Sequence, residues 1–135
     1  MANCARAVIA ADTNIVVRLL TGDEPQQTEQ ARQLFDTETV LLPKTVLLEA
    51  EWVLRRLYRL DCAAVIRALD ALISLPNVRC EDEAGVRQAL TWSHEGLDFA
   101  DALHLAASPT AERFATFDRA LVKAAAAFGL AVSAP

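Results

Sequence analysis

The sequence predicts an α/β protein with a parallel β-sheet that is covered by helices on both faces. Three observations lead to this prediction. Short runs of apolar and β-branched residues alternate along the chain with longer segments of helical periodicity. Glycine and proline stand mainly at the boundaries between these segments, where they end helices and strands. The length of 135 residues favours a single domain, and a hydrophobic fraction of 53% is typical of a compact protein.

The first expected strand covers residues 7–11 (AVIAA), whose length and composition suit a buried central strand. It ends at Asp12, the first of three small polar residues. The apolar run over residues 15–20 then predicts a short helix. Gly22 lies just beyond this run and is suited to a left-handed C-terminal cap.

A helix, a strand and a longer helix are expected next. Pro25 suits the first turn of a helix over residues 25–36. Residues 39–42 are β-branched and apolar and predict a second strand. Thr45 is a candidate N-cap for a helix that extends to residue 59. Apolar residues form a stripe along that helix, namely Val46, Leu47, Ala50, Val53, Leu54 and Leu57.

The second half of the chain repeats this alternation. Pro76, Gly96, Pro109 and Gly129 follow the ends of four expected helices. The expected elements are a helix from 61 to 75, a strand over 77–81, a helix from 82 to 94, a helix over 98–107, a strand over 114–117, a helix over 119–128 and a strand over 130–133. The sequence therefore predicts five strands, with the carboxyl ends of parallel strands at one edge of the sheet.

The charge balance limits the kinds of partner that the chain can bind. Thirteen basic and 18 acidic residues give a net charge of −5, which argues against a high-affinity binder of duplex nucleic acid. It is compatible with a metal-dependent nuclease, because bound cations themselves attract phosphate. Arg55, Arg56 and Arg59 could form a local basic strip, although a solvated helix face is the favoured interpretation.

Cysteine usage and hydropathy favour a cytoplasmic protein. The three cysteines, Cys4, Cys62 and Cys80, form no C-x-x-C pair, which favours reduced thiols over a disulfide or zinc site. No apolar run approaches the roughly 18 residues that are needed to span a membrane. The N-terminal segment lacks the long apolar region of a signal peptide, so a cytoplasmic location is expected.

Four carboxylates stand where the carboxyl edge of a parallel sheet is expected. Asp12 and Asp118 directly follow the first and fourth strands, Glu49 lies one turn into the helix after the second strand, and Asp101 lies in the first turn of a later helix. Converging carboxylates repel one another unless a cation joins them, and Mg²⁺ prefers carboxylate and water oxygens. Such a site can activate water for phosphodiester cleavage. Surface acids and helix caps are an alternative explanation of the same residues.

Four neighbouring polar residues could support such a site. Asp98 is suited to cap the helix that follows it and could instead be a further metal ligand, and the cap is favoured. Thr13 and Asn14 could bind water, phosphate or the carboxylates, while Asn14 could equally cap the short helix. Thr116 could donate a hydrogen bond to the site, although a strand threonine is usually structural.

Four segments resemble, in order, the characteristic blocks of the PIN-domain family, and of VapC toxins in particular. They are DTNIVVRLLTGD, LPKTVLLEAEWVLRR, GLDFADALHLA and FATFDR. Each block contains one of the four acids, and together the blocks cover nearly the whole chain. The resemblance implies that Asp12, Glu49, Asp101 and Asp118 are the catalytic and metal-binding residues. It also implies that residues 1–6 are an N-terminal extension of a single PIN domain.

The resemblance implies a three-layer α/β/α fold with a central parallel sheet of about five strands. The implied activity is cleavage of RNA, of transfer or ribosomal type, by an endonuclease that uses Mg²⁺ or Mn²⁺. Family members of this kind are usually homodimers, and a VapB-type antitoxin inhibits them, often with a basic side chain in the acidic pocket. The net negative charge suits such an inhibitor.

Other functions remain as alternatives. The chain could be a PIN-domain protein that binds or processes RNA outside a toxin–antitoxin pair. A magnesium-dependent phosphatase of the haloacid-dehalogenase type is disfavoured, because Asn14 stands where that class needs a second acid. A receiver domain would need an acidic pair on its first strand, which is absent. A non-catalytic PIN-like module would usually lack one or more of the four acids, and all four are present.

Overall fold

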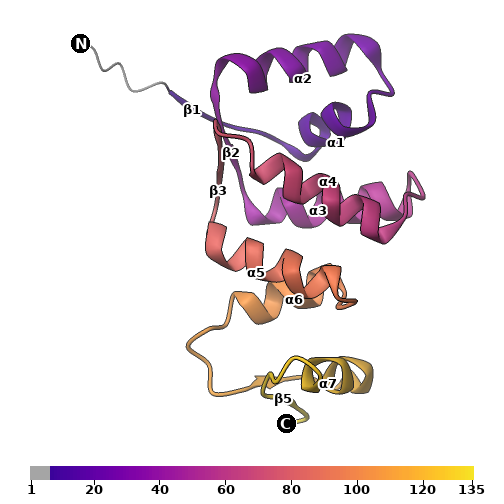
Figure 1. Cartoon of the computed structure of the whole chain (residues 1–135), viewed down its shortest axis with the longest axis vertical. Helices are drawn as coiled ribbons and strands as arrows, with labels where there is room; N and C mark the ends of the chain where they lie inside the picture. Colours follow the sequence, from indigo (N-terminus) through magenta and orange to yellow (C-terminus); the bar gives the residue numbers. More distant parts are fainter. Residues whose placement is uncertain (1–6) are drawn as a thin grey trace. The chain divides into compact units, whose positions relative to one another are not determined.

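The computed structural model describes residues 7–135 and confirms the predicted α/β class. This part of the chain contains seven helices and five strands, and all of its strand pairs are parallel, as expected. It divides into two compact units, Met1–Glu83 and Ala84–Pro135 (Figure 1). The predicted extension over residues 1–6 lies outside the described residues.

The first unit contains a three-stranded parallel sheet whose strands pair in the order β1-β2-β3. Its strands are β1 (Val8–Ala10), β2 (Thr39–Leu42) and β3 (Val78–Cys80). Val40 in the middle strand pairs with Ile9 on one side and with Val78 on the other. Val40 and Leu42 are fully buried, so the middle strand forms the centre of this part of the core.

The predicted burial of the first strand is wrong, although its position is correct. β1 has one neighbour in this sheet, β2, and Val8 and Ile9 are 55% and 37% exposed. A short apolar run indicates a strand, but its composition does not distinguish a central strand from an edge strand.

Four helices complete the first unit: α1 (Thr13–Thr21), α2 (Pro25–Thr37), α3 (Lys44–Arg56) and α4 (Cys62–Ile73). In Figure 1, α2 lies beside α1, and α3 lies beside α4; α1 also contacts α3. Each helix turns an apolar face inward, with buried side chains that include Val16, Ala31, Leu47, Leu54 and Leu69. Burial of this face, rather than intrinsic propensity, is what stabilises most helices in proteins.

The helix α1 begins two residues earlier than expected because Asp12 caps it. The Asp12 carboxylate accepts a hydrogen bond from the Thr13 backbone N–H at 2.7 Å. Asn14 therefore lies inside the helix, and the capping role considered for it is wrong. Gly22 ends the helix with a φ of 66°, and its N–H donates to the carbonyl of Arg18, which confirms the predicted C-terminal cap.

The helix α3 differs from the prediction at both ends. Pro43, not Thr45, occupies the N-cap, and its carbonyl accepts the N–H groups of Val46 and Leu47. The N–H of Lys44 donates to a Glu81 carboxylate oxygen at 2.8 Å, so the first turn needs no threonine cap. The helix ends at Arg56 instead of residue 59.

Two other predicted features of α3 and α4 need correction. Leu57 is 65% exposed and therefore does not belong to the apolar stripe. Asp61 occupies the N-cap position of α4 but makes no side-chain capping bond. The helix α4 ends at Ile73, two residues before the expected end, and Ser74 forms its C-terminal cap.

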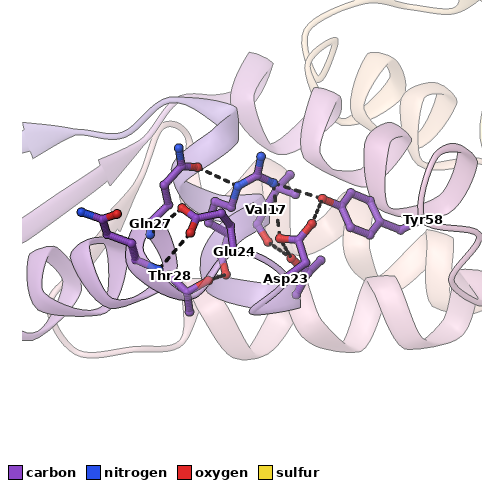
Figure 2. A network of polar contacts seen from close by, with 9 residues as sticks. Val17, Asp23, Glu24, Gln27, Thr28 and Tyr58 are labelled. Carbon is purple, nitrogen blue, oxygen red and sulfur yellow. Dashed lines mark hydrogen bonds and ion pairs between the residues drawn. The ribbon is translucent and has the colours of Figure 1, made fainter.

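A polar network joins the turn between α1 and α2 to the segment that follows α3 (Figure 2). Asp23 is at its centre and accepts hydrogen bonds from the hydroxyls of Tyr58 at 2.5 Å and Thr21 at 2.9 Å. Its carboxylate also pairs with the Arg18 guanidinium at 3.4 Å. Arg18 in turn donates to the side-chain oxygen of Gln27 in α2. Asp23 and Arg18 thus connect α1, α2 and the segment that follows α3.

Tyr58→Phe should raise the pKa of Asp23 toward its ordinary value. The hydrogen bond from Tyr58 is the largest of the influences that lower this pKa, followed by the bond from Thr21. Because the folded-state pKa is depressed, the stabilisation is present at neutral pH and is lost as the pH falls through that value. A side-chain NMR titration measures the change. An equal or larger effect of Thr21→Val would contradict the central role of Tyr58.

The second unit contains a two-stranded parallel sheet and three helices, the first of which begins at the boundary between the units. Its elements are α6 (Phe99–Ala106), β4 (Phe114–Ala115), α7 (Arg119–Ala126) and β5 (Val132–Ser133), and α5 (Glu83–His94) begins at the boundary between the units. Phe114 pairs with Val132, and Ala115 pairs with Ser133. Both strands are shorter than predicted, although the N–H of Thr116 still donates to the carbonyl of Ser133 at 3.0 Å.

The described helices and thiols agree with two further sequence observations. Across residues 7–135, every helix is too short or too polar to cross a membrane. Cys62 carries a free thiol, the Cys80 thiol donates a hydrogen bond to the Glu81 carbonyl at 3.7 Å, and Cys4 lies outside the described residues.

Candidate active site

In the first unit, Asp12, Thr13 and Glu49 lie together at the start of α1. The Thr13 hydroxyl donates a hydrogen bond of 2.5 Å to the Glu49 carboxylate. Thr13 is only 5% exposed, whereas Asp12 and Glu49 are exposed. Thr13 thus connects the two acids: its N–H donates to Asp12, which follows the first strand, and its hydroxyl donates to Glu49, which follows the second.

Packing between α1 and α3 positions this group. The two helices are in contact, with Val16 and Val17 of α1 buried and Leu47 and Ala50 of α3 buried. Glu49 lies between Leu47 and Ala50 in sequence but on the outer side of the helix. Because Glu49 is exposed, its carboxylate needs no buried partner.

In the second unit, Asp98 and Asp118 each cap a helix. Asp98 accepts a hydrogen bond from the backbone N–H of Asp101 at 3.2 Å, which confirms the predicted N-cap of α6. Asp118 accepts the N–H of Leu121 at 3.1 Å and caps α7, and its own N–H donates to the Thr116 hydroxyl at 3.0 Å. The capping role of Asp118 was missed, although an Asp directly before a helical segment is the usual signal for it.

Asp101 is a half-buried acid whose surroundings disfavour its charged form. Partial burial raises the pKa of its carboxyl, and the negative charges of Asp98 and Asp118 raise it further. The opposing influence is His104, whose charge lowers the pKa. Asp98 and Asp118 therefore both repel the charge of Asp101, and His104 offsets part of that repulsion.

The donor atoms of both groups suit a hard divalent cation. Asp12, Glu49, Asp98 and Asp118 each use one oxygen in the hydrogen bonds described above. Among residues 7–135, none of the predicted acids forms an ion pair with Lys or Arg. Within either unit, no three Asp, Glu, His or Cys side chains of the described chain are grouped closely enough to hold a metal. Carboxylate oxygens are the ligands that Mg²⁺ and Mn²⁺ prefer.

Asp98→Asn should lower the pKa of Asp101, because it removes the stronger of the two repelling charges while asparagine still caps the helix. The raised folded-state pKa determines how the stability of the protein changes with pH. In the absence of metal, ionisation of Asp101 destabilises the fold, so stability falls as the pH rises from the ordinary Asp value through the raised one. An NMR titration of Asp101 measures the pKa. A smaller shift in Asp118→Asn is expected, and no shift in either variant would contradict the proximity of the three acids.

Two further residues, Glu51 and Asn14, lie on the helices that carry Thr13 and Glu49. Glu51 pairs with Arg55 at 2.7 Å, and Glu51 is 4% exposed and so is not a surface residue. Its buried carboxylate is neutralised by the half-buried guanidinium and is not available to a metal. Asn14 is exposed on α1, and its supporting role stays a prediction.

Comparison with known proteins gives one result that covers nearly the whole chain. The family model described as PIN domain matches residues 9–127. This range contains all four of the acids that the sequence predicts as site residues. No match was found among curated proteins.

Proposed function

Because the chain belongs to the PIN domain family, whose members are generally metal-dependent nucleases, we propose that it is a magnesium-dependent endoribonuclease and the toxin of a type II toxin–antitoxin pair. The proposed substrates are transfer or ribosomal RNA. The proposed metal ligands and catalytic residues are Asp12, Glu49, Asp101 and Asp118, with Mn²⁺ as a possible substitute for Mg²⁺. Thr13, Asn14, Asp98 and Thr116 are proposed as supporting residues.

The observation that carries the proposal is that these acids form no ion pair with Lys or Arg among the described residues. In the described chain, none of the four makes an ion pair, and the pKa of Asp101 is raised by burial and by two neighbouring carboxylates. Burial and neighbouring negative charges disfavour the ionised form of a carboxylate unless positive charge offsets them. A divalent cation supplies the missing charge, which supports a metal role for the group.

The proposed reaction is the addition of water across a P–O bond of the RNA backbone. A bound divalent cation supplies Lewis acidity, which lowers the pKa of water and stabilises negative charge on phosphate oxygens. The chain contributes the orientation of the ligands. Thr13 holds one Glu49 oxygen, and capping bonds fix one oxygen each of Asp12 and Asp118. The N-termini of α1, α6 and α7, which begin at or next to these acids, favour negative charge.

Thr13→Val should reduce cleavage about tenfold, because a hydrogen bond to a charged carboxylate typically stabilises its geometry by about 1.5 kcal/mol or more. Thr13→Ser keeps the hydroxyl and is the matched control. The measurement is kcat/KM for RNA cleavage at saturating Mg²⁺. Equal activity of the valine and serine variants would show that the bond to Glu49 has no catalytic role.

A basic inhibitory segment and a second copy of the chain are the partners that we propose. The net charge of −5 and the uncompensated acids suit an antitoxin of the VapB type that places a cationic side chain against them. We also propose that the chain forms a homodimer and acts in the cytoplasm. The alternative is a PIN-domain enzyme that processes RNA outside such a pair. The two are distinguished by expression: a toxin arrests growth, and co-expression of the protein encoded beside it restores growth.

Incubation of the purified chain with transfer RNA and ribosomal RNA tests the activity. Endonucleolytic fragments are expected with Mg²⁺ and none with EDTA. Fragments of equal yield in EDTA would exclude the metal mechanism. A magnesium-dependent phosphatase would instead release phosphate from a phosphomonoester and form an acyl-phosphate on Asp12, and neither product is expected.

A further inference from the structure

The exposed side of α3 carries a defined set of residues. Thr45, Glu49, Trp52 and Arg56 are the exposed positions of this helix, and the other nine are buried or half-buried. At about 100° per residue, these four fall within about 60° of one another around the helix axis. They therefore form one narrow line along the helix, which we call the α3 stripe.

Glu49 and Trp52 are neighbours on this stripe. They are separated by three residues, which places them one above the other on a helix surface. Helical side chains lean toward the N-terminus, so Trp52 leans toward the turn that carries Glu49. Trp52 is 48% exposed, which is unusual for a large aromatic side chain in a helix that otherwise buries its apolar residues.

The stripe continues from the aromatic residue to positive charge. Arg56 is exposed four residues after Trp52 and makes no ion pair within the described residues. Its neighbour Arg55 differs, because Glu51 binds it at 2.7 Å. Arg59 follows with a φ of 56°, a left-handed conformation that glycine or asparagine adopts more easily. Arg59 is thus a second exposed arginine, in a backbone conformation that disfavours arginine.

We propose that the α3 stripe binds single-stranded RNA next to the active site, with a base stacked on Trp52 and a backbone phosphate on Arg56. This inference rests on the proposed nuclease function. A flat aromatic ring beside uncompensated arginines is the combination that binds single strands without reading sequence. In a chain of net charge −5, the position of Arg56 about two helical turns from Glu49 gives the strand a direction toward the proposed metal ligands.

A second copy of this chain is the competing occupant of the stripe. A self-association surface needs a broad apolar centre, whereas the stripe alternates an acid, an aromatic residue and a base along one helix. Glu49 and Arg56 lie on either side of Trp52. This arrangement suits a polyanion that binds Arg56 and approaches a metal near Glu49 better than it suits the apolar centre of a dimer interface.

The test measures RNA cleavage by Trp52→Ala, Trp52→Phe, Arg56→Gln and Arg67→Gln in the full chain. Trp52→Ala and Arg56→Gln should raise KM roughly tenfold and leave kcat unchanged. Trp52→Phe keeps an aromatic ring and should bind nearly as well as the parent. Arg67 is exposed on α4, so Arg67→Gln removes the same charge away from the stripe and should have no effect.

Binding of a single-stranded oligoribonucleotide in EDTA gives a second readout that does not need catalysis. Arg56→Gln should reduce the slope of log affinity against log salt by about 0.7, as expected for one lost phosphate contact. Unchanged KM and unchanged binding in both Trp52→Ala and Arg56→Gln, with RNA still cleaved, would overturn the inference and leave the proposed function intact. Loss of the dimer in Trp52→Ala, with KM unchanged, would overturn it in favour of self-association. If the parent chain neither binds nor cuts RNA, the proposed function fails instead.

Discussion

Asp101→Asn should reduce metal-dependent RNA cleavage by at least about 100-fold, the scale on which enzymes lose rate when a group that acts directly on the reaction is removed. The substitution keeps the size of the side chain and removes its charge. The pKa of Asp101 is raised by burial and by Asp98 and Asp118, so its surroundings destabilise the ionised carboxylate. A charged acid at this position does not help the fold, which favours a role in metal binding. Cleavage rates at saturating Mg²⁺ measure the loss.

The same substitution should leave the fold intact or stabilise it. In metal-free protein, Asp101→Asn removes repulsion between three carboxylates, so the midpoint of urea unfolding should stay the same or rise. Asp36→Asn removes an exposed carboxylate from α2 and is the matched control, with unchanged activity expected. Full activity in Asp101→Asn, or equal loss in Asp36→Asn, would remove Asp101 from the proposed site.

Phe99→Ala should destabilise the protein by about 3–5 kcal/mol, the usual cost of deleting a fully buried phenylalanine side chain. Phe99 is 2% exposed and stands between Asp98 and Asp101 in the first turn of α6. It therefore anchors the turn that presents both acids. Urea unfolding at neutral pH measures the change in free energy.

Phe117→Ala provides the comparison for this measurement. Phe117 is 86% exposed and immediately precedes Asp118, so its deletion should change stability by no more than about 0.5 kcal/mol. Similar losses from the two substitutions would mean that the described burial of Phe99 is wrong.

The sequence predicted the elements well because their signals are local. Residues 39–42 form a short β-branched and apolar run that ends at Pro43, and residues 78–80 lie shortly after Pro76. Each segment forms a strand within the predicted range. Gly22 provides the left-handed cap that its position after a helical run indicates. Asp98 was likewise recognised as a cap from its place before an apolar helix.

Features that depend on packing between distant residues could not be predicted. The bond from Thr13 to Glu49 joins residues that are 36 positions apart and exists because α1 packs against α3. The exposure of β1 depends on which strands pair with it. The burial of Glu51 depends on how α3 is rotated against its neighbours, which the charge pattern of Glu51 and Arg55 alone does not determine. Local propensity contains none of this information.

Calorimetric titration of the full chain with Mn²⁺ addresses the most basic requirement of the proposed function: Asp12 and Asp101 must both contribute to binding of a divalent cation. The chain, Asp12→Asn, Asp101→Asn and the double variant would be compared. We expect each single substitution to weaken the same binding event, and the double variant to lose little more than either alone, because the two side chains are coupled through one ion. Undiminished Mn²⁺ binding in either single variant, or independent and additive losses, would contradict a shared metal centre.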